Sequence, residues 1–138
     1  MCGIAGLYLT DREAAVDSRL LKRMSERLTH RGPDDEGVVV EHHVGLAVRR
    51  LRIIDLQTGD QPIANEDRTV WIVFNGEIYN YRELRDELLA EGHTFRTRSD
   101  TEVLVHLYEE EGLGFLTRVN AMLAVSLWDK KRRRLVLA

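Results

Sequence analysis

Polar and apolar residues follow two different periods along this chain, and the two periods separate expected strands from expected helices. Short apolar runs predict strands at residues 3–9, 38–40, 44–48 and 70–74, and a hairpin at residues 121–128 and 134–137. Apolar residues three to four positions apart predict three helices. These helices are expected from a cap at Asp17 or Ser18 to His30, from Asn80 to Gly92, and from a capping box of Ser99 and Glu102 to Gly112.

Polar segments connect these elements. Residues 31–37 hold a proline and two glycines, so we expect a loop there, and residues 51–69 are expected to form a longer polar loop. The apolar run at 70–74 is expected to end at Asn75 and Gly76, a pair that is typical of turns. Strand hairpins with helices between them, in place of strict strand–helix–strand alternation, favour an α+β fold with antiparallel sheets.

Length, composition and charge limit the classes of protein to which this chain can belong. Its 138 residues suit one domain, and 43% hydrophobic with 31% charged residues are typical of a globular protein. A net charge of −3 gives no electrostatic basis for binding nucleic acid or an anionic membrane. No apolar run approaches the roughly 20 residues of a membrane span. One cysteine cannot form an internal disulfide, so we expect a cytoplasmic protein. The five histidines show no metal-binding spacing with that cysteine, and we expect no metal site.

The single cysteine stands at position 2, directly after the initiator methionine. Methionine is normally removed when the next side chain is small, so we expect Cys2 to become the first residue. Its thiol and a free α-amine would then belong to one residue, and such an amine can accept the thiol proton without help from a histidine. A cysteine near the N-terminus without a catalytic role is the alternative that position alone leaves open.

Five further sequence tags accompany Cys2. They are His-Arg-Gly-Pro-Asp at 30–34, Arg-Leu-Arg-Ile-Ile-Asp at 50–55, Gln-Pro at 61–62, Asn-Gly-Glu-Ile-Tyr-Asn at 75–80 and Ser-Asp-Thr-Glu at 99–102. Together with the start Met-Cys-Gly-Ile-Ala-Gly, these tags resemble the class II glutamine amidotransferases, which are N-terminal-nucleophile hydrolases. Within that class the chain resembles the glutaminase half of glutamine-hydrolysing asparagine synthetase, and the matches spread over nearly all of its length.

The resemblance implies a four-layer αββα sandwich with two antiparallel sheets, and hydrolysis of the glutamine side-chain amide to glutamate and ammonia. It also implies that residues 1–138 lack the last strands of this domain and the whole synthetase domain, which is the expected partner in the full-length protein. ATP and magnesium are expected only of that missing half, so we expect no cofactor in this chain. An incomplete sheet can pair with a second copy of the chain, which makes a homo-oligomer possible. A catalytically silent fragment or a regulatory module that keeps the fold is the alternative function.

The same resemblance implies the residues of the site, and each suits its role chemically. Cys2 is the expected nucleophile, and Asn75 and Gly76 are the expected oxyanion hole and substrate contacts, because amide hydrolysis develops a negative oxygen that needs preorganised donors. The guanidinium of Arg50 suits the glutamine α-carboxylate, whereas its neighbour Arg49 is expected to be a solvated charge. The other expected substrate-binding residues are Leu51, Ile53, Ile54, Glu77 and Asp100, the last two facing the α-ammonium. A strand-ending turn at residues 75–76 and helix-dipole pairing by Asp100 are the alternatives.

Overall fold

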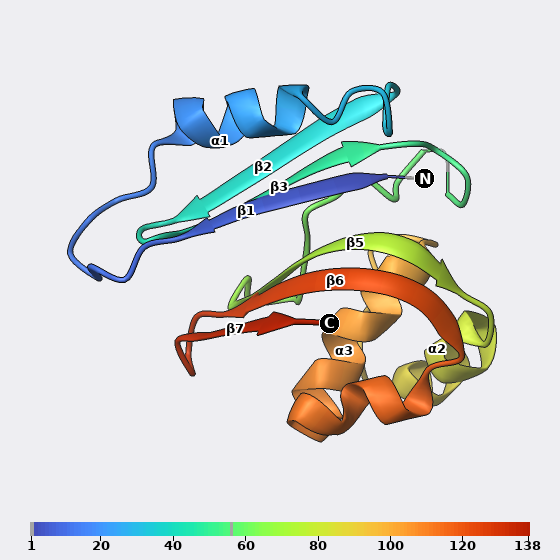
Figure 1. The fold of residues 1–138 in the computed structure, drawn as a ribbon. Coiled ribbons are helices and arrows are strands. Elements are labelled where there is room, and N and C mark those ends of the chain that lie inside the picture. Colours follow the sequence, from blue (N-terminus) through green and yellow to red (C-terminus); the bar gives the residue numbers. More distant parts are fainter. Residues whose placement is uncertain (1, 56) are drawn as a thin grey trace.

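Two antiparallel β-sheets lie face to face in this protein, and helices cover the outer face of each sheet (Figure 1). The computed structural model describes residues 2–55 and 57–138. The elements are, in chain order, β1 (Gly3–Tyr8), α1 (Ser18–Glu26), β2 (Asp35–Glu41), β3 (Val44–Arg50), β4 (Ile63–Ala64), β5 (Val70–Ile78), α2 (Tyr81–Ala90), α3 (Asp100–Glu111), the 3-10 helix η1 (Gly112–Arg118), β6 (Ala121–Asp129) and β7 (Arg134–Leu137).

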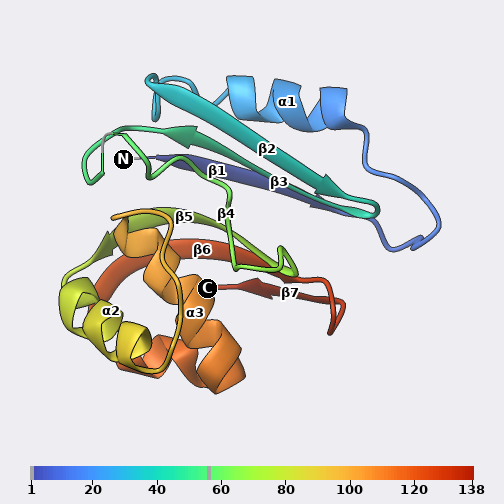
Figure 2. The same cartoon turned by 180° about the vertical axis from the view of Figure 1, so that it is seen from behind.

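The strand order explains the layers. The first sheet has the order β1-β3-β2 and the second has the order β4-β5-β6-β7, and neighbouring strands are antiparallel in both. Helix α1 packs on the first sheet, whereas α2 and α3 pack on the second, as the view from behind also shows (Figure 2). This arrangement confirms the expected α+β fold, with two antiparallel sheets between helical layers.

The two sheets pack through an apolar cluster that we call the intersheet layer. Its buried members are Val44, Leu46, Val48, Val73 and Trp128. Side chains alternate along a strand, so the first three point from β3 toward the second sheet, while Ala47 points toward α1. Because β3 is covered on both faces, its residues 44–48 are all apolar and all buried.

Three strand boundaries differ from the sequence prediction because a neighbouring strand extends the pairing. Residues 35–37, which were expected in a loop, begin β2 and pair with β3. The long polar loop contains the short strand β4, which pairs with β5. Strand β5 does not end at residue 75, since β6 pairs with it as far as Ile78. Asn75 and Gly76 are therefore strand residues, and the turn alternative was wrong.

The helix ends follow local signals only in part. Asp17 caps α1 by accepting a hydrogen bond from the Arg19 amide, as expected. The helix nevertheless ends at Glu26 and not at His30, since residues 27–31 form turns. Gly112 ends α3 with a positive φ of 57°, a conformation that glycine adopts without strain. Asn80 precedes α2 as expected, but its side chain makes no capping hydrogen bond with the described residues.

The expected capping box at the start of α3 is not formed. Ser99 accepts a hydrogen bond from the Thr101 amide (3.2 Å), which caps the helix. The buried carboxylate of Glu102 instead accepts hydrogen bonds from the amides of Arg96 (2.8 Å) and Thr97 (2.7 Å). Glu102 therefore holds the connection between α2 and α3 against the helix.

An apolar groove of about 340 Å³ separates the outer strands β1 and β7 of the two sheets. Residues 4–8 of β1 line one side, and Leu135 and Leu137 of β7 line the other. Leu137 is 70% exposed. The expectation that residues 1–138 form one incomplete domain, and that its open edge supports self-association, stays a prediction.

Candidate active site

A cavity of about 240 Å³ lies beside the start of β1, the end of β3, the middle of β5 and the start of α3. It is smaller than the roughly 300–1,000 Å³ of sites for drug-sized ligands, so it suits a small molecule. The nine residues that the sequence assigned to the site all line it: Cys2, Arg50, Leu51, Ile53, Ile54, Asn75, Gly76, Glu77 and Asp100. The fold therefore brings together every segment that carries a candidate residue.

Cys2 lies directly before β1, and its side chain packs against the intersheet layer. Its Sγ accepts a hydrogen bond from the Leu51 amide (3.3 Å) in the loop after β3. Its carbonyl oxygen accepts one from Nε of Arg31 (3.0 Å) in the turns after α1. The thiol is free of any disulfide and borders the cavity. These contacts hold the candidate nucleophile within reach of a ligand in the cavity.

Asn75 faces the same cavity because of its place in β5. Trp71 and Val73 pack in the intersheet layer, and Asn75 is the next residue on that face of the strand. The side-chain oxygen of Asn75 is buried, and among the described residues it has no hydrogen-bond partner. Burial of an amide oxygen without a hydrogen bond costs free energy. This cost indicates that the Asn75 side chain is kept free to bind a ligand. Rotation of the amide group can present either its oxygen or its NH2.

Gly76 borders the cavity at an edge of β5 that β4 does not cover. Successive amides of a strand point to opposite edges, so those of Phe74, Gly76 and Ile78 share one edge. Oε1 of Gln61 accepts a hydrogen bond from the Phe74 amide (2.6 Å). Oδ2 of Asp100 accepts one from the Ile78 amide (3.0 Å). The Gly76 amide lies between these two, and no described side chain accepts its hydrogen bond, so it is available as a donor to a ligand.

Gly76 is also required by the close approach of β6. A Cβ at this position would lie 2.1 Å from the Met122 carbonyl oxygen and 2.8 Å from the Leu123 Cα. We expect Gly76→Ala to push β5 away from β6 and to lower the free energy of unfolding by about 1–3 kcal/mol or more, as measured by urea denaturation. Gly114→Ala is the matched control, because its Cβ would meet only the Glu111 Cβ at 3.9 Å. Equal losses in the two variants would contradict the close approach.

Arg50 is buried beside the cavity, and its guanidinium is already bonded to the protein. The residue is only 4% exposed. One terminal nitrogen donates to Oδ1 of Asp60 (2.6 Å). The other donates to the carbonyl oxygens of Ile54 (3.0 Å) and Asp55 (2.6 Å). Arg50 therefore shapes the loop of residues 51–60, and a ligand carboxylate has to displace Asp60 or share its guanidinium nitrogen.

Arg49 is not the solvated charge that the sequence predicted. Its side chain is 13% exposed. Its Nε donates to the Gly32 carbonyl oxygen (3.0 Å), and its guanidinium pairs with Glu36 (3.2 Å). The prediction was wrong because β2 lies beside β3 and places Glu36 directly opposite Arg49. Arg49 thus fixes the chain before β2, on the face of β3 away from Arg50.

Two carboxylates border the cavity at the side where β5 meets α3. Asp100, the first residue of α3, is 5% exposed, whereas Glu77 is exposed. Burial raises the pKa of the Asp100 carboxyl above its usual range, although the hydrogen bond from the Ile78 amide opposes this effect. The two side chains offer negative charge to a ligand ammonium, and Asp100 also stands where a helix N-terminus favours an anion.

Asp55 anchors the loop of residues 51–60 to the connection before α3. Its carboxylate accepts hydrogen bonds from the amides of Thr58 (2.9 Å) and Arg98 (2.7 Å). Partial burial acts to raise the pKa of Asp55, but hydrogen bonds with Thr58 and Arg98 outweigh this effect and lower the pKa to about 2. The carboxylate is therefore ionised across the neutral pH range, and the loop wall of the cavity stays anchored.

Five further residues border the cavity that the sequence did not assign to it: Gln61, Phe74, Ser99, Thr101 and Met122. Gln61, Ser99 and Thr101 belong to the sequence tags, so the signal for them was present. Besides its bond to Phe74, Gln61 donates from Nε2 to Oγ1 of Thr101 (3.4 Å) and so joins β5 to α3. Met122 lies opposite Glu77 on β6, and only the strand pairing places it there.

A solved structure shares the fold of this protein. The solved structure of glutamine phosphoribosylpyrophosphate amidotransferase from Bacillus subtilis matches with a TM-score of 0.72, over 94% of this chain and 35% of that chain, at 18% sequence identity. The chain therefore has the fold of the N-terminal-nucleophile amidotransferases.

A family model described as a glutamine amidotransferase domain matches residues 1–138, and the chain belongs to this family. Glutamine-hydrolyzing asparagine synthetase 2 of Bacillus subtilis is 44% identical over 139 residues, which are 99% of this chain and 18% of the relative. Glutamine-hydrolyzing asparagine synthetase of Sandersonia aurantiaca is 48% identical over 141 residues, which are 100% of this chain and 26% of the relative. The chain thus spans about a quarter or less of the length of these relatives.

Proposed function

We propose that this chain hydrolyses the side-chain amide of glutamine to glutamate and ammonia. One observation carries the proposal: three groups border one small cavity. They are the Cys2 thiol, the Asn75 side chain, whose oxygen has no hydrogen-bond partner among the described residues, and the edge of β5 at Gly76 that β4 leaves uncovered. A nucleophile opposite two donors is the arrangement that acyl transfer from an amide needs. The membership in the amidotransferase family supports the same reaction.

The proposed reaction has two steps. The Cys2 sulfur attacks the carboxamide carbon and passes its proton to the Cys2 α-amine, and the resulting oxyanion is held by the Asn75 NH2 and the Gly76 amide. The C–N bond then breaks, the amine returns the proton to the leaving nitrogen, and ammonia departs. Water attacks the glutamyl thioester in the second step, which releases glutamate and restores the thiol.

We propose that two sides of the cavity bind the two charged groups of glutamine, its α-carboxylate and its α-ammonium. Arg50 would meet the α-carboxylate, while Asp100 and Glu77 would meet the α-ammonium. Leu51, Ile53 and Ile54 form the loop wall between them. A substrate with both charges suits such a site better than a simple amide.

The recipient of the ammonia is proposed to be an ATP-dependent synthetase domain in the full-length protein. Relatives named glutamine-hydrolyzing asparagine synthetases support this, because the chain matches only 18% and 26% of two of them. ATP and magnesium would act in that domain, so no cofactor is proposed for this chain. The reaction is proposed to occur in the cytoplasm, where a lone thiol stays reduced. No helix among the described residues is long and apolar enough to cross a membrane.

Ammonia release tests the proposal. The purified chain is expected to convert glutamine to glutamate and ammonia in equal amounts, and to leave asparagine, a shorter amide with the same charges, almost unchanged. A folded chain that releases no ammonia from glutamine would instead support the alternative of a catalytically silent or regulatory module.

Arg50→Lys is expected to raise the KM for glutamine more than it lowers kcat. Lysine keeps the positive charge but lacks the planar fork that Arg50 uses on Asp60, Ile54 and Asp55. A lost hydrogen bond to a charged group costs about 1.5–3 kcal/mol, so KM should rise by about 10- to 150-fold. Steady-state kinetics and thermal unfolding are measured together. An unchanged KM with a lowered Tm would show that Arg50 only supports the loop.

The affinity for glutamine is expected to fall at acidic pH because Asp100 becomes protonated. Burial raises the pKa of this carboxyl, so its charge is lost at a higher pH than that of a free aspartate. KM should therefore be constant above the raised pKa and increase as the pH drops through it. Asp100→Asn should have a high KM at every pH and should lose this dependence. The same acidic increase in Asp100→Asn would assign it to another group.

A further inference from the structure

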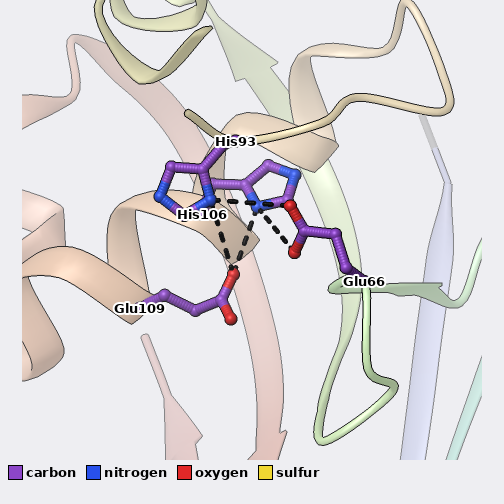
Figure 3. A group of neighbouring side chains, drawn as sticks. All are labelled: Glu66, His93, His106 and Glu109. Atoms are coloured by element: carbon purple, nitrogen blue, oxygen red, sulfur yellow. Dashed lines mark hydrogen bonds and ion pairs between the residues drawn. The ribbon is translucent and has the colours of Figure 1, made fainter. Parts of the chain in front are cut away.

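Four potential metal ligands from three separate segments point toward one another beside α3 (Figure 3). Glu66 comes from the loop between β4 and β5, His93 from the connection between α2 and α3, and His106 and Glu109 from α3 itself. One ligand atom from each lies within 4.8 Å of every other. We propose that these four residues, which we call the His/Glu site, bind a divalent transition-metal ion, with zinc as the best fit.

The distances between the ligand atoms suit one ion held by all four side chains. Nδ1 of His106 lies 3.1 Å from Oε2 of Glu109 and 3.7 Å from Oε2 of Glu66. Nδ1 of His93 lies 3.7 Å from Oε1 of Glu66 and 3.9 Å from Oε2 of Glu109. A tetrahedral zinc ion with ligands at about 2.0–2.2 Å needs ligand atoms about 3.3–3.6 Å apart. These four distances lie within a few tenths of an ångström of that range, and every other pair of ligand atoms lies within 4.8 Å, so small side-chain movements would close the site around the ion.

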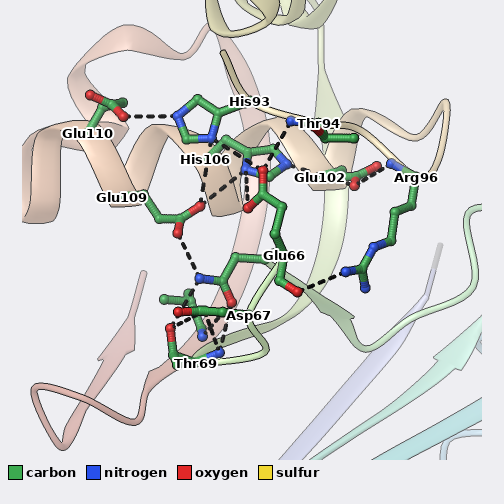
Figure 4. Close-up of polar contacts among 12 residues, drawn as sticks. Glu66, Asp67, Thr69, His93, Thr94, Arg96, Glu102, His106, Glu109 and Glu110 are labelled. Atoms are coloured by element: carbon green, nitrogen blue, oxygen red, sulfur yellow. Dashed lines mark hydrogen bonds and ion pairs between the residues drawn. The ribbon is translucent and has the colours of Figure 1, made fainter. Parts of the chain in front are cut away.

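The outer nitrogen of each histidine faces a further carboxylate (Figure 4). Nε2 of His93 lies 2.9 Å from Oε1 of Glu110. Nε2 of His106 is buried without a hydrogen-bond partner among the described residues, and it lies 3.8 Å from Oε1 of Glu102. A histidine that binds metal through one nitrogen usually donates the other N–H to a carboxylate, which fixes its tautomer. Both histidines are arranged to bind metal through Nδ1.

The two carboxylate ligands are also held in place. Oε1 of Glu66 accepts a hydrogen bond from the Thr94 amide (3.0 Å). Oε1 of Glu109 accepts one from Nδ2 of Asn65 (2.7 Å). Each of these acids therefore keeps an oxygen directed at the histidines while its orientation is fixed by a neighbour. Supporting contacts of this kind around metal ligands are typical of a built metal site.

The charge of the site favours a cation. Glu66 and Glu109 supply the two negative charges that neutralise a divalent ion, and no described lysine or arginine forms an ion pair with either carboxylate. Burial acts to lower the pKa of His106, but Glu102, Glu109 and Glu66 outweigh it and raise the pKa to about 9. A proton on His106 is thus the competing occupant, and metal binding has to displace it.

The donor set selects the kind of ion and its role. Imidazole nitrogens suit zinc and its neighbours, whereas magnesium and calcium prefer oxygen ligands alone. Protein groups fill all four tetrahedral positions, so the ion would be structural. It would fasten two loops to α3, the helix whose first residue, Asp100, borders the active-site cavity. The proposal does not depend on the proposed glutaminase activity.

Zinc binding is tested on the chain without an affinity tag, after removal of metal by a chelator. Calorimetric titration with zinc is expected to show one ion per chain, and zinc should raise the Tm. Cobalt(II) should give the visible absorption of a tetrahedral ion. His93→Ala should abolish this binding, whereas Glu110→Gln should weaken it by about 10- to 100-fold. His30→Ala removes an exposed histidine outside the site and should bind zinc like the unaltered chain.

Two results would overturn the proposal. One is an unaltered chain that binds no zinc, in which case protonated His106 and its carboxylates form an ion-pair network without metal. The other is a folded His93→Ala variant that binds zinc as tightly as the unaltered chain. Circular dichroism of the metal-free variants shows whether they fold. The Glu110 side chain is about half exposed, so its replacement should leave the fold intact. The zinc affinity of Glu110→Gln therefore tests the proposal even if His93→Ala does not fold.

Discussion

Replacement of Cys2 by alanine is expected to reduce ammonia release from glutamine to background while the fold is kept. The chain has no second cysteine, and the proposed mechanism has no other nucleophile. Cys2→Ser is the stricter variant, because serine keeps a hydroxyl where the sulfur accepts the hydrogen bond from the Leu51 amide. Ammonia assays and thermal unfolding are measured on both variants. Release of ammonia by Cys2→Ala at the rate of the unaltered chain would exclude the thiol as the nucleophile.

The mechanism also requires a free α-amine on Cys2. Met1 lies outside the described residues, so its removal is tested by the mass of the intact chain. A preparation that retains Met1 is expected to be about 10²- to 10⁴-fold slower, which is the usual contribution of a positioned base. Equal rates for the two forms would show that another group takes the proton, even if Cys2→Ala is inactive.

Asn75→Ala is expected to lower kcat for glutamine by about 10²- to 10³-fold with little change in KM. The Asn75 amide has a buried oxygen without a partner among the described residues, and the cavity that it borders also contains Cys2. A donor aimed at the developing oxyanion acts mainly in the transition state, so its loss should appear in turnover and not in binding. Steady-state kinetics over a range of glutamine concentrations separates the two constants.

Two variants accompany Asn75→Ala. Asn75→Asp should be at least as damaging, because a carboxylate repels the oxyanion. Asn120→Ala, which changes an exposed asparagine outside the cavity, should keep the kinetics of the unaltered chain. If Asn75→Ala mainly raises KM, the side chain contacts the bound substrate, and the oxyanion hole must consist of backbone amides.

Sequence patterns predicted which elements exist better than where they begin and end. The cap at Asp17 and the stop at Gly112 depend on neighbouring residues, and both are present. The start of β2 and the continuation of β5 to Ile78 depend on partners supplied by β3 and β6, which no local pattern contains. The burial of Arg49 has the same origin, since Glu36 reaches it only through strand pairing.

The sequence tags predicted which residues border the cavity but not what those residues contact. The ion pair of Arg50 with Asp60 and the hydrogen bond from the Phe74 amide to Gln61 depend on the path of the chain between β3 and β5. The described residues there, 51–55 and 57–69, are irregular apart from β4. The cluster of side chains that forms the proposed His/Glu site was not predicted, for a similar reason. Its four side chains come from three segments, so they have no compact spacing in the sequence.

Turnover in this protein is expected to be a sensitive measure of how its two sheets are docked. Cys2 precedes the first strand of one sheet, while Asn75 and Gly76 belong to an inner strand of the other. The intersheet layer therefore sets the distance between the proposed nucleophile and its proposed oxyanion donors. A displacement of about 1 Å can cost about 10²-fold in rate. A small repacking deep in this layer would thus change the rate of ammonia release before it measurably changed the melting temperature.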